Sequence, residues 1–125
     1  MSKRVLIVDD SMLMRKMIAE TLADDGWEIA GEASDGAQAV RQFEALRPDA
    51  VTMDIVMPGT DGLHALQQIL EAHPDAKVVV VSALNQTKLI SEAIRKGAQD
   101  FIAKPFLPEQ LQYTMRSCVE EGVAV

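Results

Sequence analysis

Five short, mostly apolar runs, each followed by a stretch with helical spacing, constrain the fold of this chain more than any other feature. Such runs are typical of strands buried on both faces of a sheet. They cover residues 4–8, 28–33, 50–53, 77–81 and 100–103. The intervening windows place apolar residues on one helical face. The first window has Met14, Met17, Ile18, Thr21 and Leu22 at i, i+3, i+4, i+7 and i+8, and a later window has Ile90, Ala93 and Ile94. The chain therefore alternates strand and helix throughout.

Alternating strands and helices predict a parallel sheet that is covered by helices on both faces. Five such units favour an α/β fold with a five-stranded parallel sheet in the flavodoxin-like strand order 2-1-3-4-5. The 125 residues fit one domain with a substantial core, so we predict a single domain over residues 1–125. In this arrangement the strand order reverses between the first and third strands. Ligands bind in the crevice at that point, at the carboxyl ends of the strands.

Polar residues stand at the carboxyl ends of four of the five predicted strands. Asp9 and Asp10 follow the first strand, Asp54 the third, Ser82 the fourth and Lys104 the fifth. Taken singly, each has an ordinary explanation, such as a solvated turn, a helix cap or a surface lysine. Together they predict one site with three carboxylates, a hydroxyl and an ammonium.

This set of groups suits a divalent cation and a phosphoryl group. Mg²⁺ prefers oxygen ligands and is typically bound through one or two carboxylates plus phosphate. We expect Asp10 and Asp54 as direct ligands, Asp9 as a ligand through water, and the backbone carbonyl of Val56 as a further oxygen. Three crowded carboxylates repel one another, so at least one pKa should rise when no metal is bound.

Asp54 is also a candidate nucleophile, because a carboxylate can attack phosphorus and form an aspartyl-phosphate. Phosphoryl transfer requires mainly positioning of the group and neutralisation of its oxygens. Mg²⁺ would take one of these oxygens, the Lys104 ammonium a second and the Ser82 hydroxyl a third. A nucleophile that is already ionised needs no separate general base.

The chain resembles the receiver domain of bacterial two-component response regulators, most closely the stand-alone type that acts in chemotaxis. The landmarks of this resemblance are residues 5–11, 54–62, 82–83 and 104–106, in this order and at these spacings. The resemblance implies that Asp54 is the phosphoacceptor, that Asp9 and Asp10 hold Mg²⁺, and that Ser82 and Lys104 contact the phosphoryl group. It also implies a histidine kinase as phosphodonor.

The resemblance further implies a switch and an output surface. The Ser82 hydroxyl would move toward the phosphate and the ring of Phe101 would turn inward behind it. Phe101 lacks the hydroxyl of the tyrosine that is commoner at this position, and the small Ala83 would leave space for the ring. The bond between Lys104 and Pro105 would be cis. Targets would bind the face formed by the fourth helix, the fifth strand and the fifth helix.

Several apolar residues fall outside the predicted core pattern, near the acidic residues or around the last two helices. They are Met12, Leu13, Leu84, Leu89, Leu107 and Tyr113. Scattered exposed apolar residues are normal in folded proteins. As a group, these could form a surface for docking a partner protein.

Composition excludes several classes of function. The formal net charge of −7 disfavours contact with nucleic acid. We find no apolar stretch long enough to span a membrane and no signal peptide. A single cysteine, Cys118, cannot form an internal disulfide, so we expect a cytoplasmic location. We also expect a monomer with no appended DNA-binding or catalytic domain, whose output is protein–protein contact.

Two functions within this class remain open. The preferred one is chemotaxis signalling to the flagellar switch, and the other is a phosphorelay shuttle that passes phosphate to a histidine phosphotransfer protein. A flavodoxin-like cofactor binder is disfavoured, because the acidic Asp9 and Asp10 stand where a phosphate-binding loop would be needed. A Mg²⁺-dependent phosphohydrolase, an enzyme, is disfavoured because Val56 occupies the position of its acid/base residue. Apolar Val56 and Leu84 also predict slow self-dephosphorylation.

Overall fold

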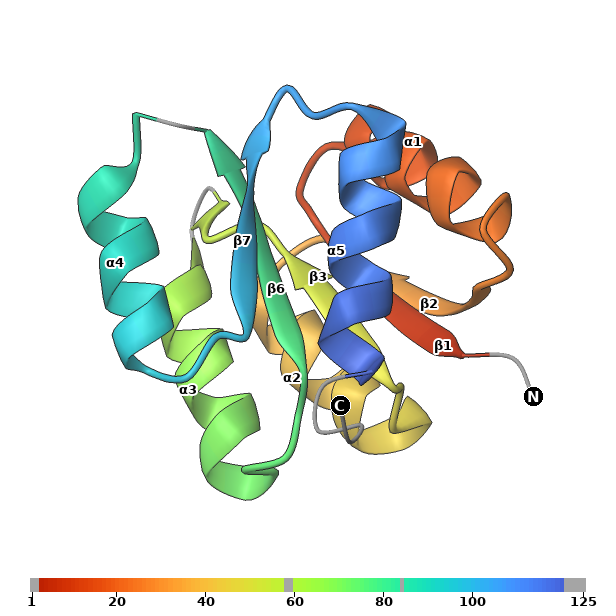
Figure 1. Ribbon diagram of the computed structural model, residues 1–125. Helices are drawn as coiled ribbons and strands as arrows, with labels where there is room; N and C mark the ends of the chain where they lie inside the picture. The colour runs from red at the N-terminus through yellow and green to blue at the C-terminus, as the bar shows by residue number, and fades with distance from the viewer. Residues whose placement is uncertain (1–2, 58–59, 84, 121–125) are drawn as a thin grey trace.

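The computed structural model describes residues 3–57, 60–83 and 85–120, and five of its strands form one parallel sheet (Figure 1). These strands are β1 (Arg4–Val8), β2 (Glu28–Ala33), β3 (Ala50–Met53), β6 (Val78–Ala83) and β7 (Asp100–Lys104). Their order is β2-β1-β3-β6-β7, and every neighbouring pair is parallel. Counted within this sheet alone, the order is 2-1-3-4-5, which confirms the prediction.

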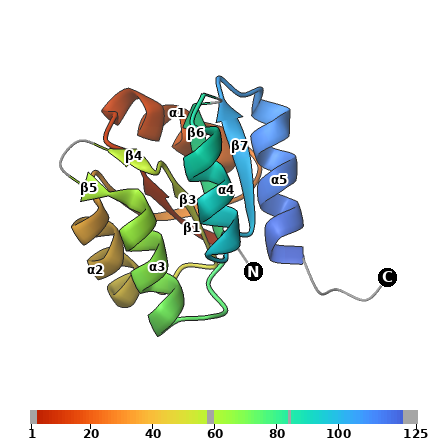
Figure 2. The same cartoon turned by 90° about the vertical axis from the view of Figure 1, so that its left-hand side faces the viewer.

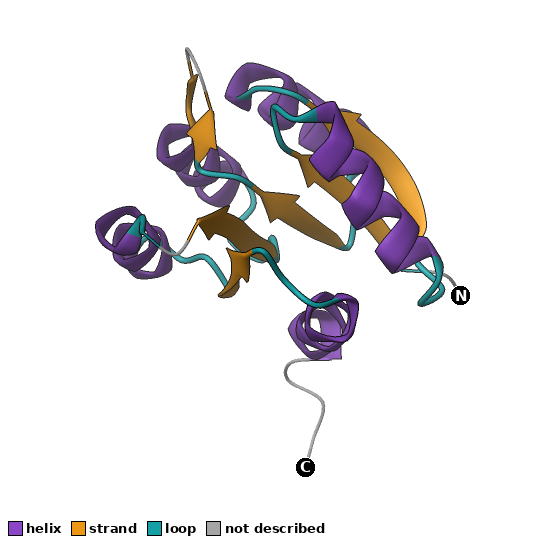
Figure 3. Ribbon diagram, turned by 90° about the horizontal axis from the view of Figure 1, so that it is seen from above, coloured by secondary structure: helices purple, strands orange, loops and turns teal. Residues whose placement is uncertain are grey.

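Five helices in the described part of the chain cover both faces of the sheet; the first four connect strands, and the fifth follows β7. They are α1 (Met12–Ala23), α2 (Gly36–Leu46), α3 (Gly62–Ala72), α4 (Thr87–Arg95) and α5 (Pro108–Glu120). Seen from above, the strands lie between helices on two sides (Figure 3). The described residues contain no helix that is both long and apolar enough to cross a membrane.

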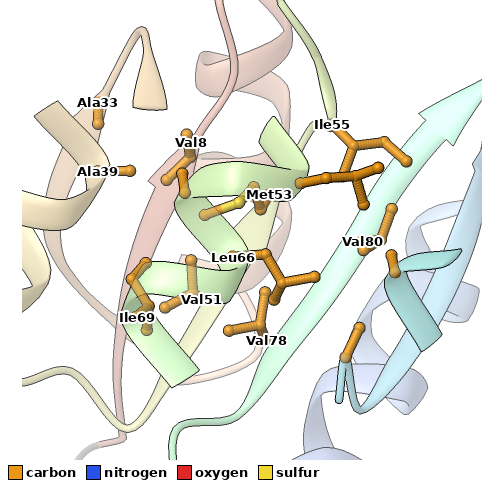
Figure 4. Close-up of a cluster of buried hydrophobic side chains, with 14 of the residues drawn as sticks. Val8, Ala33, Ala39, Val51, Met53, Ile55, Leu66, Ile69, Val78 and Val80 are labelled. Atoms are coloured by element: carbon orange, nitrogen blue, oxygen red, sulfur yellow. The ribbon is translucent and has the colours of Figure 1, made fainter. Parts of the chain in front are cut away.

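The two faces of the sheet form two separate cores, because successive residues of a strand point to opposite faces. Leu6 and Val8 of β1 pack with buried residues of α2, α3 and α4. Figure 4 shows part of this core, with Leu66 of α3 lying over the strands. Val5 and Ile7 pack on the opposite face with residues of α1 and α5. The alternation therefore decides which helices a given strand residue contacts.

A two-stranded hairpin was not predicted from the sequence. It consists of β4 (Val56–Met57) and β5 (Thr60–Asp61), which pair in antiparallel fashion before α3 (Figure 2). Strands of two residues are too short to show a period in the sequence. Val56, two residues after Asp54, is the first residue of this hairpin.

Most predicted strand limits agree with the structure, but three side chains differ from their predicted environments. Met17 and Ile94, assigned to core faces, are 45% and 42% exposed. They flank the buried residues Ile18 and Ala93, because periodicity gives the direction of an apolar stripe but not its width. Leu89, predicted outside the core, is partly buried and packs against the core formed with α3 and α4.

Candidate functional site

The sheet itself positions the two buried carboxylates of the site. The backbone N–H of Asp9 donates to the carbonyl of Ala33 at 3.0 Å, and the N–H of Asp54 donates to the carbonyl of Val8 at 3.0 Å. Hydrogen bonding between the strands thus continues one residue beyond β1 and β3. Asp9 and Asp54 are held side by side at the carboxyl edge of the sheet as a result.

Asp9, Asp10 and Asp54 form a compact acidic cluster. Each offers one carboxylate oxygen, and these oxygens all lie within 4.8 Å of one another. Asp9 and Asp54 are only 1% and 6% exposed, whereas Asp10 is exposed to solvent. Among the described residues, no hydrogen bond or ion pair reaches the Asp10 carboxylate. The cluster is therefore open to solvent on the side of Asp10.

Lys104, at the end of β7, bridges the two buried carboxylates. Its Nζ lies 2.8 Å from Oδ2 of Asp9 and 3.1 Å from Oδ2 of Asp54. The other oxygen of each carboxylate accepts a backbone N–H at 2.9 Å, from Ser11 for Asp9 and from Val56 for Asp54. Both carboxylates are therefore fixed in direction before any ligand binds.

The protonation equilibria of the site reflect burial and charge. Burial is the largest effect on Asp54 and raises its pKa, although the Val56 N–H and the Lys104 ammonium oppose the shift. Burial alone would lower the pKa of Lys104, but its hydrogen bond to Asp9 and the charges of Asp54 and Asp9 together raise it. Lys104 is therefore charged at neutral pH, while ionised Asp54 carries a cost of burial that its partners relieve only in part.

The residues present fit a hard divalent cation such as Mg²⁺. All donors in the cluster are carboxylate oxygens, which Mg²⁺ prefers, and their mutual distances suit a single ion. Three carboxylates outnumber the one ammonium of Lys104, so the site stays net negative. The unengaged Asp10 carboxylate is the natural first contact for a cation.

Ser82, in β6, contributes a buried hydroxyl that lacks a partner. The residue is 1% exposed, and its Oγ has no hydrogen bond within the described part of the chain. A buried hydroxyl without a partner is unfavourable, and such groups often mark a position where a ligand binds. The hydroxyl of Thr52 is likewise buried and unpaired. Its register neighbours Ile7 and Val79 belong to the core under α1 and α5.

Phe101 and Pro105 flank the site on β7 and just beyond it. Phe101 is 38% exposed and precedes Ile102, which packs in the core under α1 and α5. The Phe101 side chain therefore points to the face of the sheet that α4 covers. The peptide bond between Lys104 and Pro105 is cis. Val56 is 44% exposed, and the role of its carbonyl as a metal ligand stays a prediction.

The residues predicted as a docking patch fall into two exposed groups. Met12 and Leu13 begin α1 and are 74% and 70% exposed. Leu107 and Tyr113 lie before and on α5 and are 68% and 67% exposed. Leu84 lies outside the described residues. Leu89 is only partly exposed, because it packs against the core.

Two residues near the site were not found from the sequence. Arg15 of α1 donates from Nη1 to the backbone carbonyl of Asp9 at 2.6 Å. Gly62 begins α3 so close to β3 that an added Cβ would lie 2.9 Å from the carbonyl oxygen of Asp54. No pattern in the sequence marks either contact, because both depend on how a helix packs against a loop.

Comparisons with known proteins agree with this geometry. The family model of the response regulator receiver domain matches residues 5–116. The chemotaxis protein CheY of Thermotoga maritima is 48% identical over 111 residues, which cover 89% of this chain and 92% of that protein. CheY of Bacillus subtilis is 44% identical over 111 residues, with the same shares of 89% and 92%.

A solved relative has the same fold over nearly the whole chain. It is the CheX–CheY–BeF3–Mg²⁺ complex from Borrelia burgdorferi, with a TM-score of 0.87 and 35% identity. The match covers 92% of this chain and 87% of that one. Fold, site and similarity together show that the chain belongs to the response regulator receiver domain family of two-component signalling, and within it to the CheY-like proteins.

Proposed function

We propose that the chain is a phosphorylation-controlled signalling protein in which Asp54 accepts a phosphoryl group from the phosphohistidine of a partner kinase. The observation that carries this proposal is the buried Asp54 carboxylate, held beside Asp9 and Asp10 and within 3.1 Å of the Lys104 ammonium. This arrangement combines a nucleophile, a binding site for a cation and a fixed positive charge.

In the transfer step, an oxygen of ionised Asp54 forms a bond to phosphorus as the bond from phosphorus to the histidine nitrogen breaks. The electron pair of that bond leaves with the imidazole. Mg²⁺, held by Asp9, Asp10, Asp54 and the carbonyl of Val56, would neutralise charge on the phosphoryl oxygens. Lys104 provides a second positive charge at the same place. Burial raises the pKa of Asp54, and a cation bound beside it would favour the ionised nucleophile.

The Ser82 hydroxyl would couple phosphorylation of Asp54 to a conformational change in the rest of the molecule. Its unpaired Oγ can donate a hydrogen bond to a phosphoryl oxygen, and this gain exists only in the phosphorylated state. Its register partner on β7 is the small Ala103, two residues from the half-exposed Phe101. Movement of Ser82 would therefore allow Phe101 to turn inward and change the face formed by α4, β7 and α5.

The preferred pathway is chemotaxis, with the flagellar switch as target and the cytoplasm as location. Similarity to the CheY proteins of Thermotoga maritima and Bacillus subtilis supports this choice, since each match covers 92% of the relative. The Borrelia burgdorferi complex contains BeF3 and Mg²⁺, which supports the same chemistry at this site. We expect a monomer of one domain that catalyses only its own phosphorylation and dephosphorylation.

A binding experiment with a phosphoryl mimic tests this proposal. The chain would be immobilised with and without beryllofluoride plus Mg²⁺, with Asp54→Ala as control, and offered a purified flagellar switch protein and a purified histidine phosphotransfer protein. Retention of the switch protein only by the activated wild type would support chemotaxis. Retention of the phosphotransfer protein alone would favour the phosphorelay shuttle. Binding that ignores both beryllofluoride and Asp54→Ala would contradict the core assignment.

A further inference from the structure

Arg15 is a largely buried cation beside the acidic cluster, yet it contacts none of its carboxylates. Its side chain is 15% exposed. Nη1 donates to the backbone carbonyl of Asp9 at 2.6 Å, and Nε donates to Oε1 of Glu32 at 2.9 Å. The guanidinium therefore connects the loop after β1 to the edge strand β2.

The fold places both partners of Arg15 on the same side of the sheet. Glu32 is the register partner of Ile7, which packs in the core under α1 and α5. Residues that are adjacent on parallel strands point to the same face, so Glu32 also faces α1. The N–H of Arg15 donates to the carbonyl of Ser11 at 3.0 Å, which fixes Arg15 one turn beyond the N-cap of the helix. The backbone of Arg15 is therefore held by Ser11, and its guanidinium is held by Asp9 and Glu32.

Contact with the Asp9 carbonyl fixes more than Asp9. The carbonyl of Asp9 and the N–H and Cα of Asp10 belong to one planar peptide unit. Asp9 itself is already fixed, because its N–H, both carboxylate oxygens and its carbonyl all have partners. The exposed Asp10 carboxylate has none among the described residues. The orientation of this peptide plane thus decides where the Asp10 carboxylate can reach.

We propose that Arg15, oriented by Glu32, is a positioning residue for the cation site, and that it acts on Asp10 through the Asp9–Asp10 peptide. This inference rests on the proposed function, since it requires a divalent cation at Asp9, Asp10 and Asp54. Mg²⁺ demands near-octahedral ligand geometry, so a misdirected Asp10 would cost affinity. Residues that orient metal ligands typically change metal affinity by about tenfold or more when removed.

The direction in which Mg²⁺ affinity changes when Arg15 is removed distinguishes a positioning role from a purely electrostatic one. Arg15 is a cation near a cation site, so as a charge alone it repels Mg²⁺, and its removal should tighten binding. As a positioning residue it has the opposite influence, and its removal should weaken binding. Lys16, an exposed cation of the same helix, offers a matched control for the loss of one positive charge.

The test is an amide NMR titration of the full chain with Mg²⁺, following Asp10 and Asp54, for wild type, Arg15→Met, Arg15→Lys and Lys16→Met. We expect Arg15→Met to weaken Mg²⁺ binding about tenfold. Arg15→Lys should fall between it and wild type, because lysine can reach one partner but not hold both. Lys16→Met should bind as tightly as wild type or slightly tighter. The titration reports on folded protein, so a loss of stability alone would not move it.

Glu32→Gln and the double variant complete the test. Because Glu32 acts through Arg15, the two effects should not add: Arg15→Met with Glu32→Gln should bind Mg²⁺ about as weakly as Arg15→Met alone, apart from a slight weakening by the loss of the Glu32 charge. Binding by Arg15→Met as tight as that of wild type, or tighter, would overturn the inference while leaving the proposed function intact. Absence of Mg²⁺ binding in the wild type would overturn both.

Discussion

Two buried hydroxyls show how much the position of a single residue matters. Ser82 and Thr52 both have an unpaired side-chain oxygen in the described structure. Ser82 is the penultimate residue of β6, the strand next to β3, whereas the register neighbours of Thr52 belong to the core under α1 and α5. Both hydroxyls are buried and unpaired, but only Ser82 is proposed to meet a phosphoryl oxygen.

We expect Ser82→Ala to weaken binding of the phosphoryl mimic without lowering the stability of the fold. Loss of an unpaired hydroxyl should leave the free energy of unfolding unchanged or raise it by up to about 1 kcal/mol. Binding of beryllofluoride with Mg²⁺, followed by fluorine NMR, should weaken because a donor is lost. Thr52→Val is the matched control and should affect stability alone. Equal beryllofluoride binding by Ser82→Ala and wild type would contradict the role given to Ser82.

Asp54 gives stability a defined pH dependence. Burial raises its pKa above the ordinary value of 3.8, so the folded state holds this proton more tightly than the unfolded state does. Its contribution to stability therefore falls as pH rises from 3.8 through the raised pKa, and it remains unfavourable above.

Replacing the charge should remove this penalty. We expect Asp54→Asn to be more stable than wild type at neutral pH, with a gain that shrinks as the pH is lowered toward 3.8. Urea unfolding of both proteins across this range measures the difference. A gain that grew in acid would show that the pKa of Asp54 is lowered by folding, not raised.

At the scale of elements, the site depends on how closely α3 approaches β3. A Cβ on Gly62, the first residue of α3, would lie 2.5 Å from Cα of Ile55 and 2.8 Å from its carbonyl oxygen. These are backbone atoms of the segment that carries Asp54, and they cannot rotate away as a side chain could. The hairpin of β4 and β5 occupies the short connection between the two elements.

We expect Gly62→Ala to destabilise the protein by about 1–3 kcal/mol through overpacking. It should also weaken Mg²⁺ binding, because the backbone of Ile55 and Asp54 must shift. Gly26→Ala is a useful comparison: an added Cβ there meets nothing within 4 Å, but φ is +90°. It should cost about 1–2 kcal/mol through backbone strain alone. Unchanged Mg²⁺ binding by Gly62→Ala would show that the loop adapts without moving Asp54.

At the scale of the whole molecule, the most exposed large apolar side chains of the described residues, those of Met12, Leu13, Leu107 and Tyr113, belong to two regions of the chain. Leu13 is the second residue of α1, whereas Leu107 lies just before α5 and Tyr113 on it. The exposed fractions of Leu13 and Leu107 are nearly equal, at 70% and 68%. The two regions can therefore be tested with matched substitutions.

We expect Leu107→Glu and Tyr113→Glu each to weaken binding of the target by about tenfold, since burying a charge in an interface is costly. Leu13→Glu should bind the target as wild type does. All three should still bind beryllofluoride with Mg²⁺, which fluorine NMR would show. Target binding that fails for Leu13→Glu and survives in Leu107→Glu would place the output surface on α1.

The sequence by itself determined the architecture and the members of the site. Near-continuous apolar runs permit only a sheet covered on both faces, and strand order 2-1-3-4-5 brings the residues after the strands to one edge. Asp9, Asp10, Asp54, Ser82 and Lys104 could be named because each lies within about two residues of the carboxyl end of a strand. The environments predicted for Met17 and Leu89 differ from those in the structure, since periodicity gives the direction of an apolar stripe on a helix but not its width.

Only the tertiary structure decided how these residues are held. Asp54 is buried against Lys104, the Ser82 hydroxyl is left unpaired, and Arg15 reaches the Asp9 carbonyl while bound to Glu32. The close approach of Gly62 to Asp54 is of the same kind. Each contact joins segments far apart in the chain or a helix to a loop, and no local pattern records such a distance. Local propensity fixes what each segment is, and packing between segments fixes which atoms meet.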